Sequence, residues 1–146
     1  MSEQVQFNEN DILNKLLTAS ENLPEKTIRI PRLGLSFLMR GLKEQQIEDL
    51  ERRYTEVKMN RGKEERELDR ARYSRALINA STIAIGGDSN VKWDHPALLD
   101  KYKASAAEQV IKRALLPGEI NSLVDVVLEL SAYFDEPEEV EEVKNF

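Results

Sequence analysis

The chain has 146 residues, no cysteine, 21 basic against 27 acidic side chains, and a formal net charge of −6. This composition excludes a disulfide scaffold and a thiolate metal site, and it argues against a protein that binds the phosphate backbone of nucleic acid. The hydrophobic fraction is 40%, and no apolar run approaches the roughly 20 residues that span a bilayer. We therefore expect one globular domain in the cytoplasm, with neither nucleic acid nor a membrane as a partner.

The first predicted element is a short helix that begins at a capping asparagine, Asn8 or Asn10, and ends before Pro24. Its apolar residues recur at the spacing of one helical face, and they are Ile12, Leu13, Leu16 and Leu17. Such a leucine-rich helix either docks on the body of the protein or serves as a ligand for the groove of a partner.

A β-hairpin is expected next, with strands at residues 26–31 and 35–40. Residues 27–30 alternate between polar and apolar side chains, and Pro31 and Gly34 mark the turn between the strands. Because proline cannot donate a ladder hydrogen bond, Pro31 should lie at an edge or a bulge.

Two helices are predicted in the middle of the chain. The first begins near Lys43, places Ile47, Leu50, Tyr54 and Val57 on one face, and breaks at residues 60–62. The second begins near Lys63 with almost wholly charged turns, and its inward face holds Tyr73, Ala76, Leu77, Ala80 and Ala84. Residues 80–85 are either its last turns or a buried strand.

In the last third, the sequence predicts a turn at residues 86–90, a helix that begins after Pro96, and then two apolar helices. Ser105 and Glu108 have the spacing of a capping box, and the helix behind them is expected to bury Val110, Ile111, Ala114 and Leu115. Pro117 suits the first turn of the final helix, with Glu119 favoured by the helix dipole. That helix should end near Phe134 and bury Ile120, Leu123, Val124, Val127, Leu128 and Leu130.

An acidic tail follows at residues 135–146. It holds six acids against one lysine, Lys144, and such a segment cannot easily offset its own ordering entropy. We expect an arm in solvent that either solubilises the protein, binds a partner or repels RNA, and whose removal after Asp135 leaves the fold intact.

No constellation of residues indicates catalysis or a cofactor. His95 is the single histidine, so a two-histidine zinc site is excluded, and it reads as a loop residue before a helix. Asp88, Asn90 and Asp94 lack the order of an EF-hand calcium loop, and Gly86 with Gly87 lacks the lysine of a phosphate-binding loop. We predict no catalytic residue, no metal, no cofactor and no enzymatic activity; an enzyme or metal protein built on Asp88, Asp94 and His95 is a distant alternative.

Several motifs nevertheless follow one another in an order that points to a family. They are EKTIRIPRLG at 25–34, DHP at 94–96, LDKY at 99–102, LLPGEI at 115–120 with Leu123, LS at 130–131, and EEVEEVK at 138–144. With these motifs the chain resembles, over most of residues 23–144, the XkdN-like tail assembly chaperones of tailed phages and prophages of Gram-positive bacteria. The stretch 58–72 departs from the family's pattern.

The resemblance implies a non-enzymatic protein of the host bacterial cytoplasm that binds and shields the tape measure protein and is not retained in the mature virion. It also implies contacts with the tail tube protein through a longer form made by ribosomal frameshifting. Codons for Lys144, Asn145 and Phe146 can form a slippery run such as AAA-AAT-TTT. The alternative is a small adaptor or regulatory protein that binds a folded partner through its C-terminal helices.

The predicted fold is mainly α within the α+β class. It comprises a single helical domain at residues 1–134 with a small β-hairpin near 26–40, followed by the acidic flexible tail at 135–146. The predicted partner-binding surface is built from the last two helices, with Tyr133 and Phe134 at its edge. The residues assigned to it are Leu123, Val127, Leu130, Tyr133 and Phe134. The sequence assigns no oligomeric state.

Overall fold

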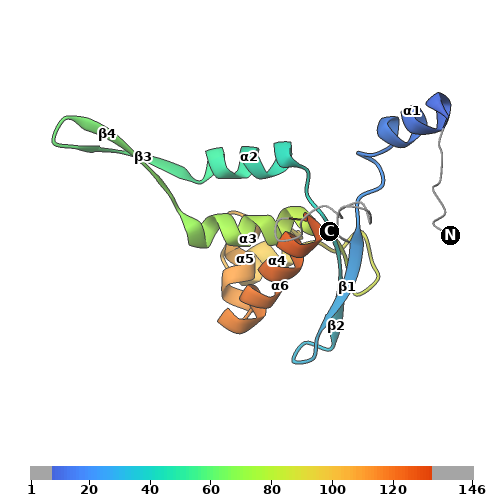
Figure 1. The fold of residues 1–146 in the computed structure, drawn as a ribbon. Helices are drawn as coiled ribbons and strands as arrows, with labels where there is room; N and C mark the ends of the chain where they lie inside the picture. Colours follow the sequence, from blue (N-terminus) through green and yellow to red (C-terminus); the bar gives the residue numbers. More distant parts are fainter. Residues whose placement is uncertain (1–7, 133–146) are drawn as a thin grey trace, which may run out of the picture.

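The computed structural model describes residues 8–132, in which six helices and five strands follow one another. Figure 1 shows most of the helices gathered in one body beside a β-hairpin, while a second hairpin and the first helix reach outward on opposite sides. In chain order the elements are α1 (Glu9–Leu17), β1 (Glu25–Ile30), β2 (Leu35–Arg40), α2 (Glu44–Arg53), β3 (Thr55–Asn60), β4 (Lys63–Leu68), α3 (Arg70–Ser81), β5 (Thr82–Ile85), α4 (Pro96–Lys101), α5 (Ala107–Ala114) and α6 (Pro117–Leu130).

The core lies where α3, α5 and α6 pack together beside the sheet. Each helix contributes fully or almost fully buried aliphatic side chains, because its apolar residues recur at helical spacing. The completely buried ones are Ile78 on α3, Val110 and Ile111 on α5, and Val127 on α6. Phe37 from β2 stacks on Trp93, with ring centroids 5.4 Å apart. Both rings are buried in the same core as the helices, where large aromatic side chains bury much apolar area.

The expected hairpin of residues 26–40 is present and belongs to a three-stranded sheet of order β1-β2-β5. Strands β1 and β2 pair antiparallel from Glu25 opposite Arg40 to Ile30 opposite Leu35. Strand β5 adds antiparallel to β2, with a register irregularity between Leu38 and Met39. Of residues 80–85, for which helix and strand were both open, Ala80 and Ser81 complete α3, and Thr82–Ile85 form the largely buried strand β5.

The prediction for residues 43–68 was wrong in its second half. Helix α2 ends at Arg53, and residues 55–68 form the antiparallel hairpin β3–β4 in place of a helical break and a new charged helix. Arg61 and Gly62 both have positive φ, 53° and 79°, which is the geometry of a two-residue type I′ turn. Val57 therefore belongs to a strand, not to the apolar face of α2.

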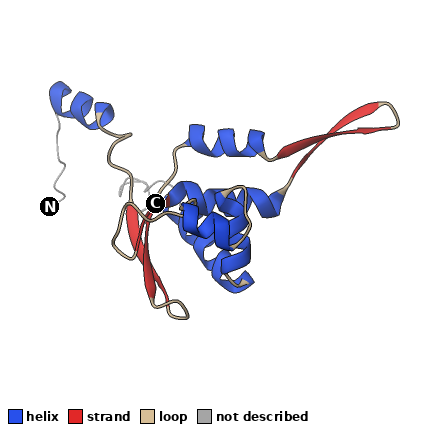
Figure 2. Ribbon diagram, turned by 180° about the vertical axis from the view of Figure 1, so that it is seen from behind, coloured by secondary structure: helices blue, strands red, loops and turns tan. Residues whose placement is uncertain are grey.

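The fold class must be corrected accordingly. The predicted single helical domain with one small hairpin is contradicted by five strands in two antiparallel sheets, and residues 8–132 form an α+β fold. Figure 2 shows the second sheet as a long ribbon of two strands apart from the helices. Among the described residues, no helix combines the length and apolarity required to cross a bilayer.

Candidate partner-binding surfaces

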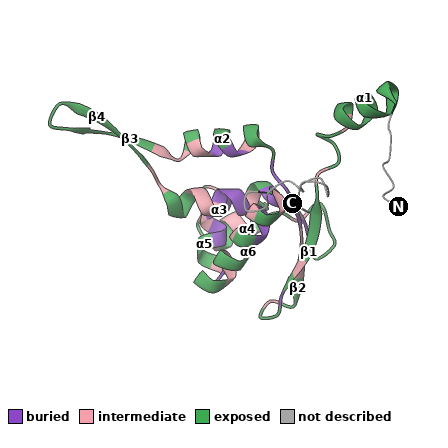
Figure 3. Ribbon diagram, viewed as in Figure 1, coloured by how far each residue is buried: buried purple, intermediate pink, exposed green. Residues whose placement is uncertain are grey.

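Helix α1 displays an apolar face that nothing in the described structure covers. Of the two capping asparagines that the sequence offered, Asn8 is the cap, and it accepts a hydrogen bond from the backbone nitrogen of Asp11 at 2.8 Å. No residue of α1 is buried, and the exposed fractions of its apolar residues are 47% for Ile12 and Leu13, 69% for Leu16 and 76% for Leu17. Figure 3 shows the helix exposed along its length and away from the body. Of the two alternatives, docking on the body is therefore not observed.

A second apolar surface lies in an open hollow of about 360 Å³ between β1 and the start of α6. Leu116, 53% exposed, stands at this hollow, and the other apolar lining comes from Ile28, Ile30, Pro31 and Leu123. Pro117 occupies the first turn of α6, as predicted, so the helix begins immediately beyond Leu116 and holds that side chain at the surface.

Arg32 and Glu119 form an ion pair beside this hollow. The guanidinium donates to both carboxylate oxygens, at 2.9 Å to Oε2 and 2.7 Å to Oε1, and it also donates to the carbonyl oxygen of Ala114 at 2.9 Å. The hydrogen bond from Arg32, followed by one from the backbone nitrogen of Leu116, lowers the pKa of Glu119 below its ordinary value. The hydrogen bond with Glu119 in turn raises the pKa of Arg32. The pair thereby fastens the β1–β2 turn to the N-terminal end of α6.

Most of the partner-binding residues predicted on the last helix face the interior or lie beyond the described chain. Leu123 and Val127 are 1% and 0% exposed, so their side chains belong to the core. Leu130 is half-buried and packs against that core. Tyr133, Phe134 and the acidic tail lie outside the described residues, where the predicted contact and the predicted solvated arm stay predictions.

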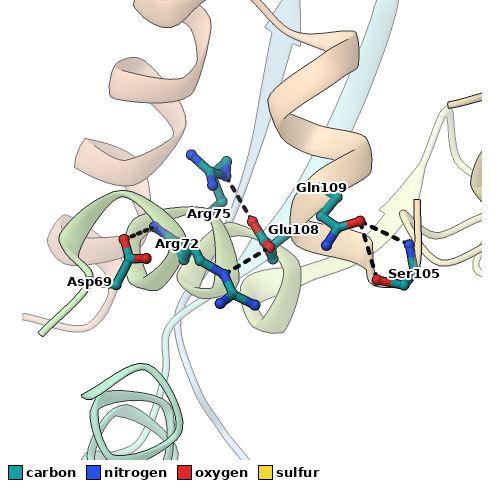
Figure 4. A network of polar contacts seen from close by, with 6 residues as sticks. All are labelled: Asp69, Arg72, Arg75, Ser105, Glu108 and Gln109. Carbon is teal, nitrogen blue, oxygen red and sulfur yellow. Dashed lines mark hydrogen bonds and ion pairs between the residues drawn. The ribbon is translucent and has the colours of Figure 1, made fainter. Parts of the chain in front are cut away.

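The predicted capping box at Ser105 and Glu108 was wrong. Glu108 does not reach back to the start of α5; it is buried and accepts hydrogen bonds from Arg72 Nε at 3.2 Å and Arg75 Nε at 2.9 Å. Gln109 takes its expected place instead, accepting from the backbone nitrogen of Ser105 at 2.9 Å. Figure 4 shows both arginines of α3 directed at the one carboxylate of α5.

The residues considered for an enzyme or a metal site have local structural roles. His95 Nδ1 accepts a hydrogen bond from the backbone nitrogen of Ala97 at 3.1 Å and so caps α4. Asp88 accepts from the backbone nitrogen of Asn90 at 2.9 Å, and Gly86 and Gly87 adopt positive φ in the same turn. These contacts are those of a helix start and a tight turn.

The hairpin β3–β4 is a further surface, which the helical reading of the sequence missed. Val57 and Met59 on β3 are 57% and 71% exposed. The signal that could have revealed it is the alternation of Thr55, Val57 and Met59 with polar residues, which ends at the turn-forming pair Arg61 and Gly62.

These surfaces belong to a chain whose relatives can be named. The model of the phage XkdN-like tail assembly chaperone proteins matches residues 13–144. The chain belongs to this family. The family match extends through the described fold, so α2, both hairpins and the three core helices are parts of a tail assembly chaperone.

Comparisons with single proteins add a structural relative. The crystal structure of the protein YqbN is similar with a TM-score of 0.56, and the match covers 88% of this chain and 98% of that chain at 16% sequence identity. At this identity the similarity concerns the fold alone. A search of curated proteins gives no significant match.

Proposed function

We propose that this member of the XkdN-like family binds the tape measure protein during tail assembly in the host cell and shields its apolar segments, without catalysing a reaction. Membership of the family supports a role in tail assembly. A long helical client exposes apolar surface until the tail tube encloses it, so it tends to aggregate. A protein that shields such a client must itself expose apolar surface that can pack against the client.

The observation that carries the proposal is the uncovered face of α1. An amphipathic helix of this length is marginal by itself in water, and amphipathic helices commonly bind by laying one face on an apolar partner. Leu16 and Leu17 are the most exposed residues of this face, at 69% and 76%. They are therefore the proposed centre of the client contact.

The hollow between β1 and α6 supplies a second contact in this proposal. Leu116 projects beside it, and apolar hollows of this kind accept single large side chains of a partner. Tyr133 and Phe134 lie outside the described residues, and the proposal keeps them as a predicted edge of the client surface. Buried Leu123 and Val127 support that surface from within the core.

Co-expression with fragments of the tape measure protein tests this function. The native chain should keep the fragments in the soluble fraction and co-purify with them. The double substitution Leu16→Ser and Leu17→Ser should leave most of the client insoluble, while the free energy of unfolding changes by about 0.5 kcal/mol or less because both side chains are exposed.

The matched control lies on the polar face of the same helix. Asn14→Ser with Lys15→Ser changes the same number of residues in the same turns and should retain the client. A native chain that leaves the tape measure fragments insoluble would contradict the proposal and favour the adaptor function, which requires a folded partner instead. Equal activity of the two double variants would remove α1 from the contact.

A further inference from the structure

The hairpin β3–β4 lacks the support that such a hairpin requires. The two strands pair only with each other in the described structure, and Figure 3 shows them exposed along almost their whole length. An isolated two-stranded hairpin is at best marginally stable in water. The open edge of β3 also presents unpaired backbone groups next to Val57 and Met59, which is the situation that promotes strand addition.

The structure determines which backbone groups of β3 are free to pair. The backbone nitrogen of Asp69 donates to the carbonyl oxygen of Tyr54 at 2.8 Å, and the type I′ turn links Asn60 to Lys63 in the same way. Hydrogen-bonded and non-hydrogen-bonded positions alternate along an antiparallel pair. The even-numbered residues of β3 therefore direct their N–H and C=O groups toward β4, and Thr55, Val57 and Met59 direct theirs outward.

On the charged face of the hairpin, two acidic side chains repel each other. Glu56 lies directly opposite Glu67, and like charges in this position destabilise a strand pair. Lys58 is the cation that contacts both, with its Nζ 3.8 Å from Glu56 and 3.5 Å from Glu67. Glu56 therefore has room for a second cation on its open side, at the free edge of β3.

We propose that a second copy of this chain supplies that cation, by pairing antiparallel with β3 about a twofold axis at Val57. The result is a four-stranded sheet in the order β4-β3-β3-β4. In this register Glu56 lies opposite Lys58 of the second copy, and symmetry repeats the pair. The assembly is independent of the client proposed above, because it uses neither α1 nor the hollow at α6.

Other registers are excluded by backbone geometry or by charge. The outward groups of the two strands must face each other, so the axis has to pass through a residue and not between two residues. An axis at Glu56 sets that carboxylate against its own copy, and an axis at Lys58 does the same for two ammonium groups. An axis at Thr55 or Met59 pairs fewer strand residues. Val57 remains.

The selected register also covers the exposed apolar side chains. Val57 packs beside Val57 of the second copy, and Met59 lies opposite Thr55 of the second copy. Each outward pair exchanges two hydrogen bonds, which gives about six in all. Strand β4 offers no equivalent edge, because every residue at 63–67 is charged and any axis there opposes a charge to itself.

The first test measures the mass of the full chain by sedimentation velocity over a range of concentrations. The native chain should form a dimer of its 16.8 kDa monomer. Glu56→Lys alone and Lys58→Glu alone each oppose like charges and should weaken the dimer at least about tenfold. An equimolar mixture of the two variants should dimerise again, because each lysine then meets a glutamate of the other chain.

A cysteine pair tests the register itself, since the chain contains no cysteine of its own. With Val57→Cys, the two Cα atoms lie about 5.5 Å apart, within the range of a disulfide. With Met59→Cys, a control position that is more exposed than Val57, the two copies lie about 13 Å apart. Rapid oxidative cross-linking of the first variant and not of the second is expected.

Three results would overturn the proposal. They are a native chain that stays monomeric at all concentrations, a mixture of the two charge variants that stays monomeric while the native chain dimerises, and cross-linking that is no faster at position 57 than at position 59. The charge variants change exposed side chains of the hairpin, and unchanged circular dichroism would show that they fold.

Discussion

Arg75 on α3 and Glu108 on α5 form a buried ion pair, with 2.9 Å between Nε and Oε2 and side-chain exposures of 11% and 3%. Arg72 reaches the other carboxylate oxygen from the more exposed side, where its own side chain is 45% exposed. Arg72 also lies over the ring of Tyr54 at 5.1 Å. One carboxylate therefore joins two core helices, and through Tyr54 the link extends to the base of the β3–β4 hairpin.

Arg75→Ala should destabilise the protein much more than Arg72→Ala. Removing Arg75 leaves a buried carboxylate with one partner near solvent, and breaking a buried pair costs roughly 3–5 kcal/mol. Removing the exposed Arg72 should cost about 1 kcal/mol. Chemical denaturation of both variants measures the difference, and equal losses would show that the burial of Arg75 does not govern the strength of the pair.

The pair of Arg32 and Glu119 should make stability depend on acid pH. The folded state lowers the pKa of Glu119, so its contribution is fully present above the unfolded pKa of about 4.3 and is lost as the pH falls through the lower folded value. Unfolding measured between pH 7 and pH 3 should show a smaller loss in Glu119→Gln than in the native chain. An unchanged profile below pH 4.3 would contradict this linkage.

Replacing Gly41 and replacing Gly118 by alanine should change the stability of the protein in opposite directions. A Cβ atom on Gly41 would collide with the backbone carbonyl of Leu130, which cannot yield without moving the end of α6. Gly41→Ala should therefore cost roughly 1–3 kcal/mol, as overpacking does. No atom lies within 4 Å of a Cβ on Gly118, so Gly118→Ala should stabilise the protein by about 0.5 kcal/mol. Thermal unfolding of the two variants provides the comparison.

Predictions from the sequence succeeded where a local pattern and a local signal agreed. Asn8 before α1, Pro117 at the start of α6, and Pro31 with Gly34 between β1 and β2 each determine the backbone by their own chemistry. The apolar periodicity also placed Val110, Ile111, Leu123 and Val127 in the interior correctly. These features need no knowledge of what packs against them.

The errors arose where two structures satisfy the same local pattern. The stretch 55–68 is rich in glutamate, arginine and lysine, which favour helix by propensity, yet its alternation and its type I′ turn select a hairpin. Similarly, Ser105 and Glu108 have capping-box spacing, but Arg72 and Arg75 approach from another helix and bind the carboxylate. The ion pairs with a distant helix therefore outweighed a capping pattern that involves only four consecutive residues.

The sequence by itself determined the family and the elements of the core, because the motifs and apolar periods that define them are properties of consecutive residues. Tertiary structure decided which surfaces stay open. Burial of Leu123 and Val127, exposure of Leu16 and Leu17, and the free edge of β3 depend on whether another segment lies against each of them. Apolar character is the same for a core residue and a contact residue, so only the packing of distant segments separates the two.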